Sequence, residues 1–246
     1  MIGAERLAAD ALRVLWHDAE CGHYREDLAL WLSLADACGG PVLDVGAGTG
    51  RVALELAAHG HEVTALDHDP ALLGALAERA ASRGLAVTTA VADATAFELG
   101  ERFALVIMPM QTVQLLDGAA ERRSFLRCAR THLQPGGLVA IAVADALQAF
   151  DGPADGLPPA DVVIAGGVAY RSQTVALTDH GDHVVIHRIR TIGEQTGGEE
   201  DRTRLAHLRP ERLRADALAC GLARRPPRTV AATAEYVGST VVIAAA

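Results

Sequence analysis

The sequence predicts an α/β fold with a mostly parallel sheet that is covered by helices on both faces. Short apolar, β-branched segments alternate with helical segments over roughly the first 145 residues, which is typical of this class. A glycine-rich turn, GAGTG, directly follows the first of these segments. The chain has 246 residues, of which 50% are hydrophobic, so it can form one such domain with a small addition.

The elements follow in order along the first part of the chain. Leu7, Leu12 and Leu15 mark one helix, and a second apolar face at helical spacing marks another before Pro41. PVLDVGAG predicts a buried strand and a tight loop, RVALELAAH a helix, and HEVTALD a second strand. Asp69 before Pro70 predicts a helix start, because the carboxylate can cap the helix and proline needs no N–H partner there.

That helix should end near Gly84, and two further strands follow it, LAVTTAVAD and FALVIMP. A helix is expected from Ala119 to His132, and QPGG is expected to turn the chain into a fifth strand, LVAIAVAD. Strands and helices thus alternate over about 145 residues, which implies a parallel sheet covered by helices on both faces.

The pattern changes after Ala146. DGPADGLPPAD predicts a loop, and VAYRSQTVAL and HVVIHRIRTI predict a β-hairpin, because turn residues lie between them. A polar loop, GEQTGGEED, a helix over RPERLRADALACG, and closing strands over TVAAT and STVVIAAA complete the chain. We therefore expect four regions: N-terminal helices over 1–40 that form a candidate lid, a ligand-binding core over 41–146, a loop and hairpin insert over 147–200, and the last helix and closing strands of the same domain over 201–246.

Composition excludes several classes of function. The net charge is -9, which disfavours nucleic-acid binding because phosphate must be neutralised by cations. The apolar runs are shorter than the roughly 20 residues of a membrane span, and the first residues lack the apolar core of a signal peptide, so we expect a cytoplasmic protein with no membrane partner. The four cysteines form no CxxC pair, so neither a metal site nor a disulfide framework is predicted.

The main chemical signal is VLDVGAGTGR, residues 42–51. Gly46, Gly48 and Gly50 lie between a strand and a helix, where glycine lets the backbone turn sharply and approach a ligand. The N–H groups at the start of the helix favour an anionic group. The spacing GxGxG is one residue tighter than the dinucleotide fingerprint GxGxxG, and Asp44 lies two residues before the first glycine. The loop therefore favours a cofactor that has no pyrophosphate.

Over roughly residues 40–145 the chain resembles the class I S-adenosylmethionine-dependent methyltransferases. DVGAGTG is similar to the family's first motif, Asp67 ends the second strand, Asp93 follows the third, and QPGG precedes the fifth. The resemblance implies that the glycine turn wraps the methionine part of the cofactor, that Asp67 accepts both ribose hydroxyls, and that Asp93 and the N–H of Ala94 bind the adenine. The full set of expected cofactor residues is Asp44, Gly46, Ala47, Gly48, Asp67, His68, Asp93, Ala94 and Met108.

MPMQ, residues 108–111, follows the fourth strand, where the family's acceptor meets the methyl group. Family members that methylate nucleobases or glutamine often carry Asn or Asp, two prolines and an aromatic residue there, so this departure weakens both readings. Gln111 could orient an acceptor by hydrogen bonds, while Met110 could line an apolar pocket or belong to the core. Tyr24 could face the sulfonium or the acceptor, or pack as an ordinary aromatic.

The hairpin is similar in layout to acceptor-covering β elements of small-molecule methyltransferases. Tyr170, Arg171, His187 and Arg188 could reach a substrate from it, or form a solvated face. We expect transfer of a methyl group to N or O of a small-molecule acceptor, in a monomer or homodimer, with Tyr24 and Gln111 as the candidate catalytic residues. The alternatives are an NAD-dependent oxidoreductase and a non-catalytic S-adenosylmethionine-binding protein.

Overall fold

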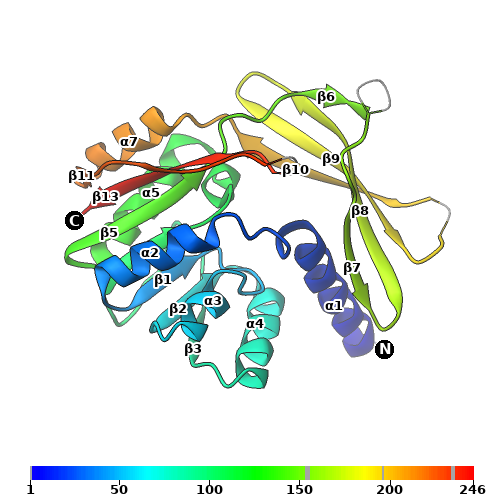
Figure 1. Cartoon of the computed structure of the whole chain (residues 1–246), viewed down its shortest axis with the longest axis horizontal. Helices are drawn as coiled ribbons and strands as arrows, with labels where there is room; N and C mark the ends of the chain where they lie inside the picture. Colours follow the sequence, from blue (N-terminus) through cyan, green and yellow to red (C-terminus); the bar gives the residue numbers. More distant parts are fainter. Residues whose placement is uncertain (1, 153–155, 196, 234–235) are drawn as a thin grey trace.

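Two β-sheets organise the chain in the computed structural model, which describes residues 2–152, 156–195, 197–233 and 236–246 (Figure 1). The larger sheet has the strand order β11-β13-β5-β4-β1-β2-β3, and β12 pairs with β13. Its first five strands in chain order are β1 (Val42–Val45), β2 (Val63–Asp67), β3 (Val87–Val91), β4 (Phe103–Met108) and β5 (Leu133–Val143). These five pair in parallel, which confirms the predicted fold class.

The chain closes this sheet with antiparallel strands. They are β11 (Ala223–Arg224), β12 (Arg228–Val230) and β13 (Ser239–Ala245), and β13 pairs with β5. QPGG differs from the prediction, because these residues lie inside β5 rather than before it. The register against β4 jumps there, from Leu133 opposite Phe103 to Leu138 opposite Leu105, so the glycines make an irregularity within the strand instead of a separate turn.

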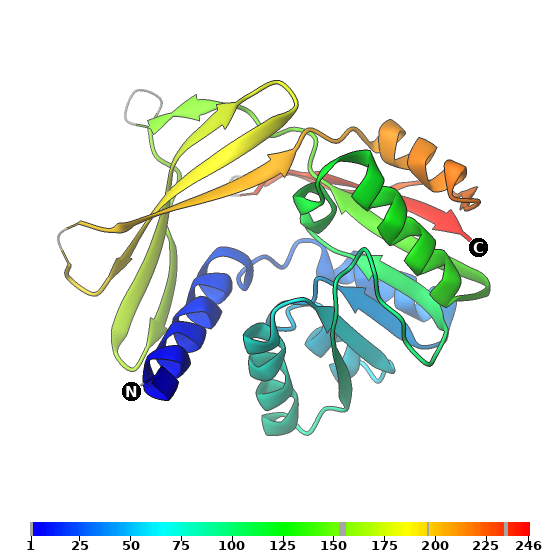
Figure 2. The ribbon, with the colours of Figure 1, turned by 180° about the vertical axis from the view of Figure 1, so that it is seen from behind.

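Helices cover both faces of the larger sheet. Figure 1 shows α2 (Leu28–Cys38), α3 (Ala53–Ala58) and α4 (Pro70–Ser82) on the near face. Figure 2 shows α5 (Gly118–His132) and α7 (Pro210–Ala219) on the opposite face. β1, β2 and β4 are consequently buried along their whole length, as expected for strands covered twice.

Local chemistry explains where α4 begins. Asp69 lies in the extended region, and its Oδ1 accepts a 2.8 Å hydrogen bond from the backbone N–H of Ala71. Pro70 occupies the first helical position, and Gly84 follows the helix with φ +64°. The predicted helix start is therefore confirmed. It could be predicted because the capping carboxylate and the proline act on residues close to them in the sequence.

The second sheet is larger than the predicted hairpin. It has the order β10-β9-β8-β6, with β7 paired to β8. Its strands are β6 (Phe150–Asp151), β7 (Asp161–Ala165), β8 (Val168–Asp179), β9 (His183–Ile192) and β10 (Glu199–Ala206). Part of the predicted loop before it, residues 153–155, lies outside the described residues.

The predicted polar loop GEQTGGEED is shorter than expected, because β10 begins at Glu199. Asp201 on β10 accepts ion pairs from two arginines of β9, Arg188 at 3.6 Å and Arg190 at 2.8 Å. Cross-strand charge pairs of this kind stabilise a polar strand that shows no apolar alternation of its own.

The first helix, α1 (Ile2–Cys21), lies between the second sheet and α4 (Figures 1 and 2). Glu20 holds it to the sheet: Arg190 donates to both carboxylate oxygens, at 2.7 and 2.9 Å, and Ser172 donates at 2.8 Å. Burial alone would raise the pKa of Glu20, but the hydrogen bonds from Arg190 and Ser172 and the charges of Arg188 and Arg190 together outweigh it and lower that pKa. Trp16 also packs edge-on against Tyr170, with ring centroids 5.7 Å apart.

A 3₁₀ helix, η1 (Thr112–Leu115), connects the two sheets. Its Gln114 is buried, and its amide exchanges two hydrogen bonds with Ala144 at the end of β5 and donates a third to the carbonyl of Ala206 at the end of β10. Among the described residues, no helix has the length and apolarity needed to span a bilayer.

Candidate active site

The glycine turn is bent tightly against the end of β2. The carbonyl of Leu66 accepts hydrogen bonds from the N–H of Gly46 at 2.8 Å and of Ala47 at 3.0 Å. Gly46 and Gly48 have φ of 73° and 55°, a backbone conformation that side chains disfavour. A Cβ at Gly46 would collide with Thr112, and one at Gly48 would collide with the imidazole of His17. Only glycine therefore fits both positions.

Asp67 lies at the end of β2 and fixes the turn. It is 6% exposed, its Oδ2 accepts a 2.8 Å hydrogen bond from the N–H of Gly48, and its Oδ1 accepts one from Asp69 at 3.0 Å. The exposed imidazole of His68 lies 3.3 Å from Oδ1. A carboxylate can accept further hydrogen bonds on the remaining lone pairs of both oxygens, so Asp67 still has capacity for a ligand.

Asp44 is the most unusual group at this edge of the sheet. It is 1% exposed, and its Oδ1 has no hydrogen-bond partner. Burial raises the pKa of Asp44 to about 7, although the nearby guanidinium of Arg51 acts in the opposite direction. A buried carboxylate oxygen without a donor is unfavourable, so this position suits a cationic donor supplied by a ligand.

Asp93 follows β3, the strand next to β2, and Asp67 pairs with Val91 two residues before it. Asp93 is exposed, and its Oδ1 accepts hydrogen bonds from the N–H and the hydroxyl of Thr95, both at 2.7 Å. These bonds lower the pKa of Asp93, and the charge of His68 contributes to the same shift. Asp67 and Asp93 therefore follow neighbouring parallel strands, and Ala94 lies half-buried beside them.

The residues at and after the end of β4 differ in burial and backbone conformation. Met108 has no accessible surface and packs in the core, so only a rearrangement would let it contact a cofactor. Met110 is partly buried and has φ 54°, the one positive value among the described residues other than glycine. Such strain often marks functional positions. Gln111 follows it, half-buried, at the start of η1.

Tyr24 is buried rather than free to meet an acceptor. Its ring packs edge-on against Tyr236 with centroids 5.0 Å apart, and the guanidinium of Arg51 lies 5.1 Å from its centroid. Burial, followed by the charge of Asp27, raises the pKa of Tyr24 to about 12. These contacts favour a packing role, and such a phenol is a poor base at neutral pH.

Two groups of residues at the glycine turn were not predicted. Asp18 of α1 accepts a 2.8 Å hydrogen bond from the hydroxyl of Thr49 and an ion pair from Arg79 of α4. His17 lies beside them, with Nδ1 3.3 Å from the same hydroxyl. Burial lowers the pKa of His17 from its ordinary value, in spite of the charges of Asp18 and nearby Asp67. Nothing in the helical spacing of α1 indicates which of its residues meets the turn.

The second group is an ion pair that joins the turn to α2. Arg51 donates to both oxygens of Asp27, at 2.5 and 2.8 Å, and Trp31 donates to the same carboxylate at 2.8 Å. Both charged side chains are almost fully buried, at 6% and 2% exposed. The only sequence signal was the position of Arg51 directly after GAGTG.

The four hairpin residues lie on different faces of the second sheet. Arg188 is opposite Thr174 and Asp201 in the strand register and faces α1 together with Tyr170, whereas Arg171 and His187 alternate to the other face. Arg188 donates to Thr203 at 2.9 Å, and its buried Nε has no partner. Tyr170 and Arg188 are therefore the pair from this set that faces the interior between the sheets.

Comparison with known proteins identifies this arrangement. Residues 42–137 match the family model described as a methyltransferase domain. The chain contains a methyltransferase domain. No curated protein matches the chain in sequence at a significant level.

Solved structures with the same fold span almost the whole chain. An S-adenosylmethionine-dependent methyltransferase from Clostridium acetobutylicum has a TM-score of 0.73 at 12% identity and covers 97% of this chain and 98% of its own. CalS10, an amino pentose methyltransferase from Micromonospora echinaspora solved with S-adenosylmethionine, has 0.68 at 23% identity, covering 93% and 95%. The sugar N-methyltransferase KedS8 from Streptoalloteichus sp. has 0.67 at 21% identity, covering 91% and 89%. At these identities the similarity establishes the fold.

The methyltransferase domain match bears on the alternatives. Class I methyltransferases use S-adenosylmethionine, and the matched segment contains the glycine turn together with Asp44, Asp67 and Asp93. This match disfavours an NAD-dependent oxidoreductase. The orphaned Oδ1 of Asp44 fits the ammonium group of the methyl donor, which is a structural reason to place that cofactor here.

Proposed function

We propose that the methyltransferase domain transfers a methyl group from S-adenosylmethionine to the amino group of a small molecule. The observation that carries the cofactor assignment is the buried Oδ1 of Asp44, which has no donor, next to a turn that only glycine can form. A ligand ammonium would satisfy that oxygen, and Asp67 would accept the ribose hydroxyls with its free lone pairs.

The residues after β4 support nitrogen rather than oxygen as the acceptor atom. The cofactor supplies an already activated methyl group, so the protein must align the acceptor with it and exclude water. Pro109, Met110, Gln111 and Thr112 offer no carboxylate, imidazole or phenol that could take a proton from a hydroxyl. An amine that arrives neutral needs no such base.

In this proposal Gln111 orients the acceptor through its amide, and Met110 lines the apolar side of the site. The second sheet covers the acceptor with the face that carries Tyr170 and Arg188. CalS10 and KedS8, whose fold matches 93% and 91% of this chain, are an amino pentose methyltransferase and a sugar N-methyltransferase. An amino sugar is therefore the acceptor class to test first.

The experiment is methyl transfer from labelled S-adenosylmethionine to a panel of amino sugars, each paired with the analogue that carries a hydroxyl in place of the amine. We expect label only on the amines, with kcat/KM rising with pH as the amine becomes neutral. Label on the hydroxyl analogues alone would contradict the choice of nitrogen. Tight S-adenosylhomocysteine binding without transfer to any small acceptor would instead support the non-catalytic alternative.

A further inference from the structure

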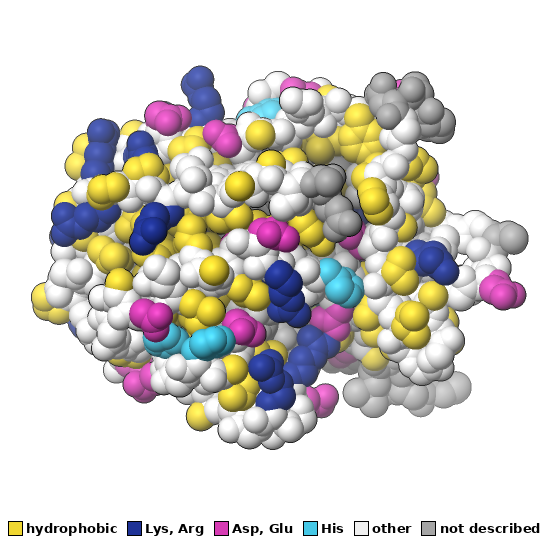
Figure 3. Space-filling view, viewed as in Figure 1, with side chains coloured by type: hydrophobic (Ala, Val, Ile, Leu, Met, Phe, Trp, Pro, Cys, Tyr) yellow, Lys and Arg dark blue, Asp and Glu magenta, His cyan; other side chains and the backbone are white. Residues whose placement is uncertain are grey.

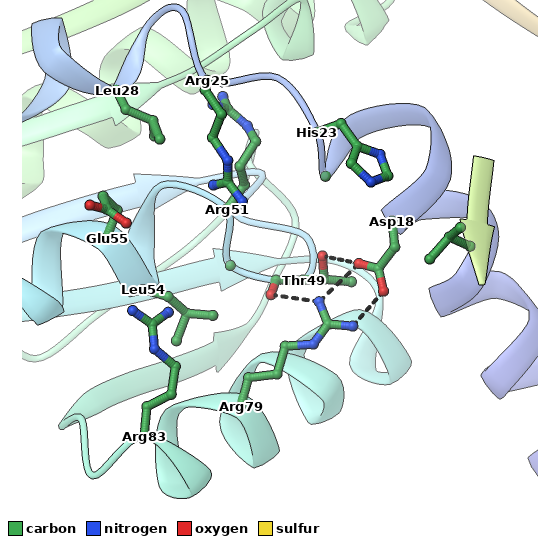
Figure 4. A pocket seen from close by; sticks show the side chains of 13 residues that line it. Asp18, His23, Arg25, Leu28, Thr49, Arg51, Leu54, Glu55, Arg79 and Arg83 are labelled. Carbon is green, nitrogen blue, oxygen red and sulfur yellow. Dashed lines mark hydrogen bonds and ion pairs between the residues drawn. The ribbon is translucent and has the colours of Figure 1, made fainter. Parts of the chain in front are cut away.

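An arginine-lined groove lies on the face of the molecule shown in Figure 3, between the end of α1 and the helices α3 and α4. Its volume is about 570 Å³. Four arginines line it: Arg25, Arg51, Arg79 and Arg83. Dark blue side chains gather near the middle of this face, and Figure 4 shows Arg25 and Arg51 on one side of the groove and Arg79 of α4 and Arg83, just after α4, on the other.

Two of these arginines already have carboxylate partners, and two do not. Arg51 is held by Asp27 and Arg79 by Asp18, so those charges are neutralised locally. Arg25 and Arg83 are exposed, and among the described residues no hydrogen-bond or ion-pair partner is found for either guanidinium group. Two uncompensated cations thus share one groove in a chain whose net charge is -9.

The remaining lining defines the rest of the binding surface. His23 can add a hydrogen bond, and Leu28 and Leu54 supply apolar surface. Two carboxylates line the groove as well: Asp18, which is paired with Arg79, and Glu55, which lies 3.7 Å from His59 and is therefore the opposing charge. Cations at the edge and apolar surface within suit an organic molecule that carries a multivalent anion.

We propose that this groove binds the phosphate groups of a small phosphorylated molecule, at a site separate from that of the cofactor. Arginine is suited to phosphate because its planar guanidinium donates two parallel hydrogen bonds to one anion. The groove is lined by Thr49, Gly50 and Arg51 of the glycine turn, but not by the three carboxylates proposed for the cofactor, Asp44, Asp67 and Asp93. The two proposed sites therefore use different side chains.

Isothermal titration calorimetry with pyrophosphate, at constant ionic strength, tests the site directly. Wild type is expected to give saturable binding, tighter than with inorganic phosphate. Arg25→Gln and Arg83→Gln should each weaken pyrophosphate binding by about tenfold, the change expected from one lost charge-assisted contact. Arg25→Lys and Arg83→Lys, which keep the charge, should weaken it less.

Two further variants test whether the effect is specific to the groove. Arg171→Gln removes an exposed arginine from the outer face of the second sheet and should leave pyrophosphate affinity unchanged. Glu55→Gln removes the opposing charge and should tighten binding. Equal weakening in Arg171→Gln would show a general charge effect and overturn the proposal, as would wild-type affinity in the Arg25→Gln, Arg83→Gln double variant or heats that do not saturate.

Saturation with S-adenosylhomocysteine separates this site from the cofactor site. The proposal expects pyrophosphate to bind the saturated protein with a dissociation constant within about twofold of that of the free protein, whereas competition would contradict a separate site. Because the readout is direct binding, a failure to methylate amino sugars would leave this result standing. Thermal unfolding of each variant confirms that it is folded, which is expected because Arg25 and Arg83 are exposed.

Discussion

The N–H of Gly48 donates a 2.8 Å hydrogen bond to Oδ2 of Asp67, and this bond joins the glycine turn after β1 to the end of β2. The two features that a class I cofactor site requires, a tight turn and an acid on the neighbouring strand, therefore support each other. The same carboxylate must accept the cofactor's ribose hydroxyls in our proposal.

Replacing Asp67 should weaken cofactor binding more than it weakens the fold. Asp67→Asn removes the charge and at least one acceptor position, so we expect the dissociation constant of S-adenosylhomocysteine to rise about 10- to 100-fold, as hydrogen bonds to charged groups contribute roughly 1.5–3 kcal/mol. Calorimetry measures this. The control is Asp69→Asn, two residues further on, because asparagine still caps α4. Equal losses in both variants would remove Asp67 from its proposed role.

Asp44 should give cofactor binding a pH dependence. An ammonium beside Asp44 favours its ionised form, and the pKa of about 7 in the free protein means that protons compete for it at neutral pH. S-adenosylhomocysteine affinity should therefore fall about tenfold from pH 8 to pH 6 in wild type. Asp44→Asn should bind more weakly at pH 8 with a flatter profile. An unchanged slope in Asp44→Asn would assign the titration to another group, such as His17.

The same residue predicts how stability changes with pH. The folded-state pKa of about 7 lies above the ordinary value of 3.8, so the stability linked to Asp44 is fully present below pH 3.8 and is lost as pH rises through about 7. Urea denaturation at each pH measures the free energy of unfolding of Asp44→Asn and of wild type. From pH 5 to pH 8 the difference between them should shift in favour of the variant by a few kcal/mol, at about 1.4 kcal/mol per pKa unit. No relative gain over that range would contradict a raised pKa.

The contact of Asp18 with Thr49 and Arg79 should hold α1 on the glycine turn. Asp18→Asn removes a partly buried ion pair, so hydrogen exchange in α1 and in the turn should speed up, with a loss of about 1–2 kcal/mol of stability. Asp10→Asn is the control on the same helix, because Asp10 forms an exposed ion pair with Arg13 at 3.5 Å. Faster exchange in α1 alone, with the turn unaffected, would show that Asp18 does not couple the two.

Breaking a buried ion pair away from the glycine turn should lower stability and leave cofactor binding unchanged. Asp216 of α7 is fully buried and accepts hydrogen bonds from Arg122 at 3.1 Å and Arg123 at 2.9 Å. Asp216→Ala leaves the buried Arg122 without a partner and should lower the free energy of unfolding by about 3–5 kcal/mol in urea. Glu211→Ala, on the exposed side of α7, should change it little. S-adenosylhomocysteine affinity should stay the same in the folded Asp216 variant.

Gln111 tests the acceptor side of the site. Gln111→Ala should lower kcat/KM for the amine acceptor about tenfold through loss of orienting hydrogen bonds, and should leave S-adenosylhomocysteine affinity unchanged. Steady-state kinetics and calorimetry on the same preparation separate the two effects. A loss of cofactor affinity instead would place Gln111 in the cofactor site.

The sequence predicted those features whose cause is local. Asp69 and Pro70 start α4 through their own backbone contacts, and the burial of β1 follows from its apolar run. Residues 199–201, where β10 begins, fall within the predicted polar loop because Asp201 finds Arg188 and Arg190 only across the strand pairing.

The candidate site likewise contains some features with a local cause and others that depend on packing. The positions of Gly46 and Gly48 can be inferred from their spacing, since their conformation is a backbone property. The approach of His17 and Thr112 to those glycines depends on how α1 and η1 pack, which no local pattern encodes. The missing donor at Asp44 likewise emerges only from packing.

The central claim is that the glycine turn, Asp44 and Asp67 together hold the methyl donor. Calorimetric titration of the purified protein with S-adenosylhomocysteine and, separately, with NAD tests it most directly. The account predicts one S-adenosylhomocysteine bound per chain, weakened in Asp44→Asn and Asp67→Asn, and no heat with NAD. Saturable NAD binding without S-adenosylhomocysteine binding would contradict it.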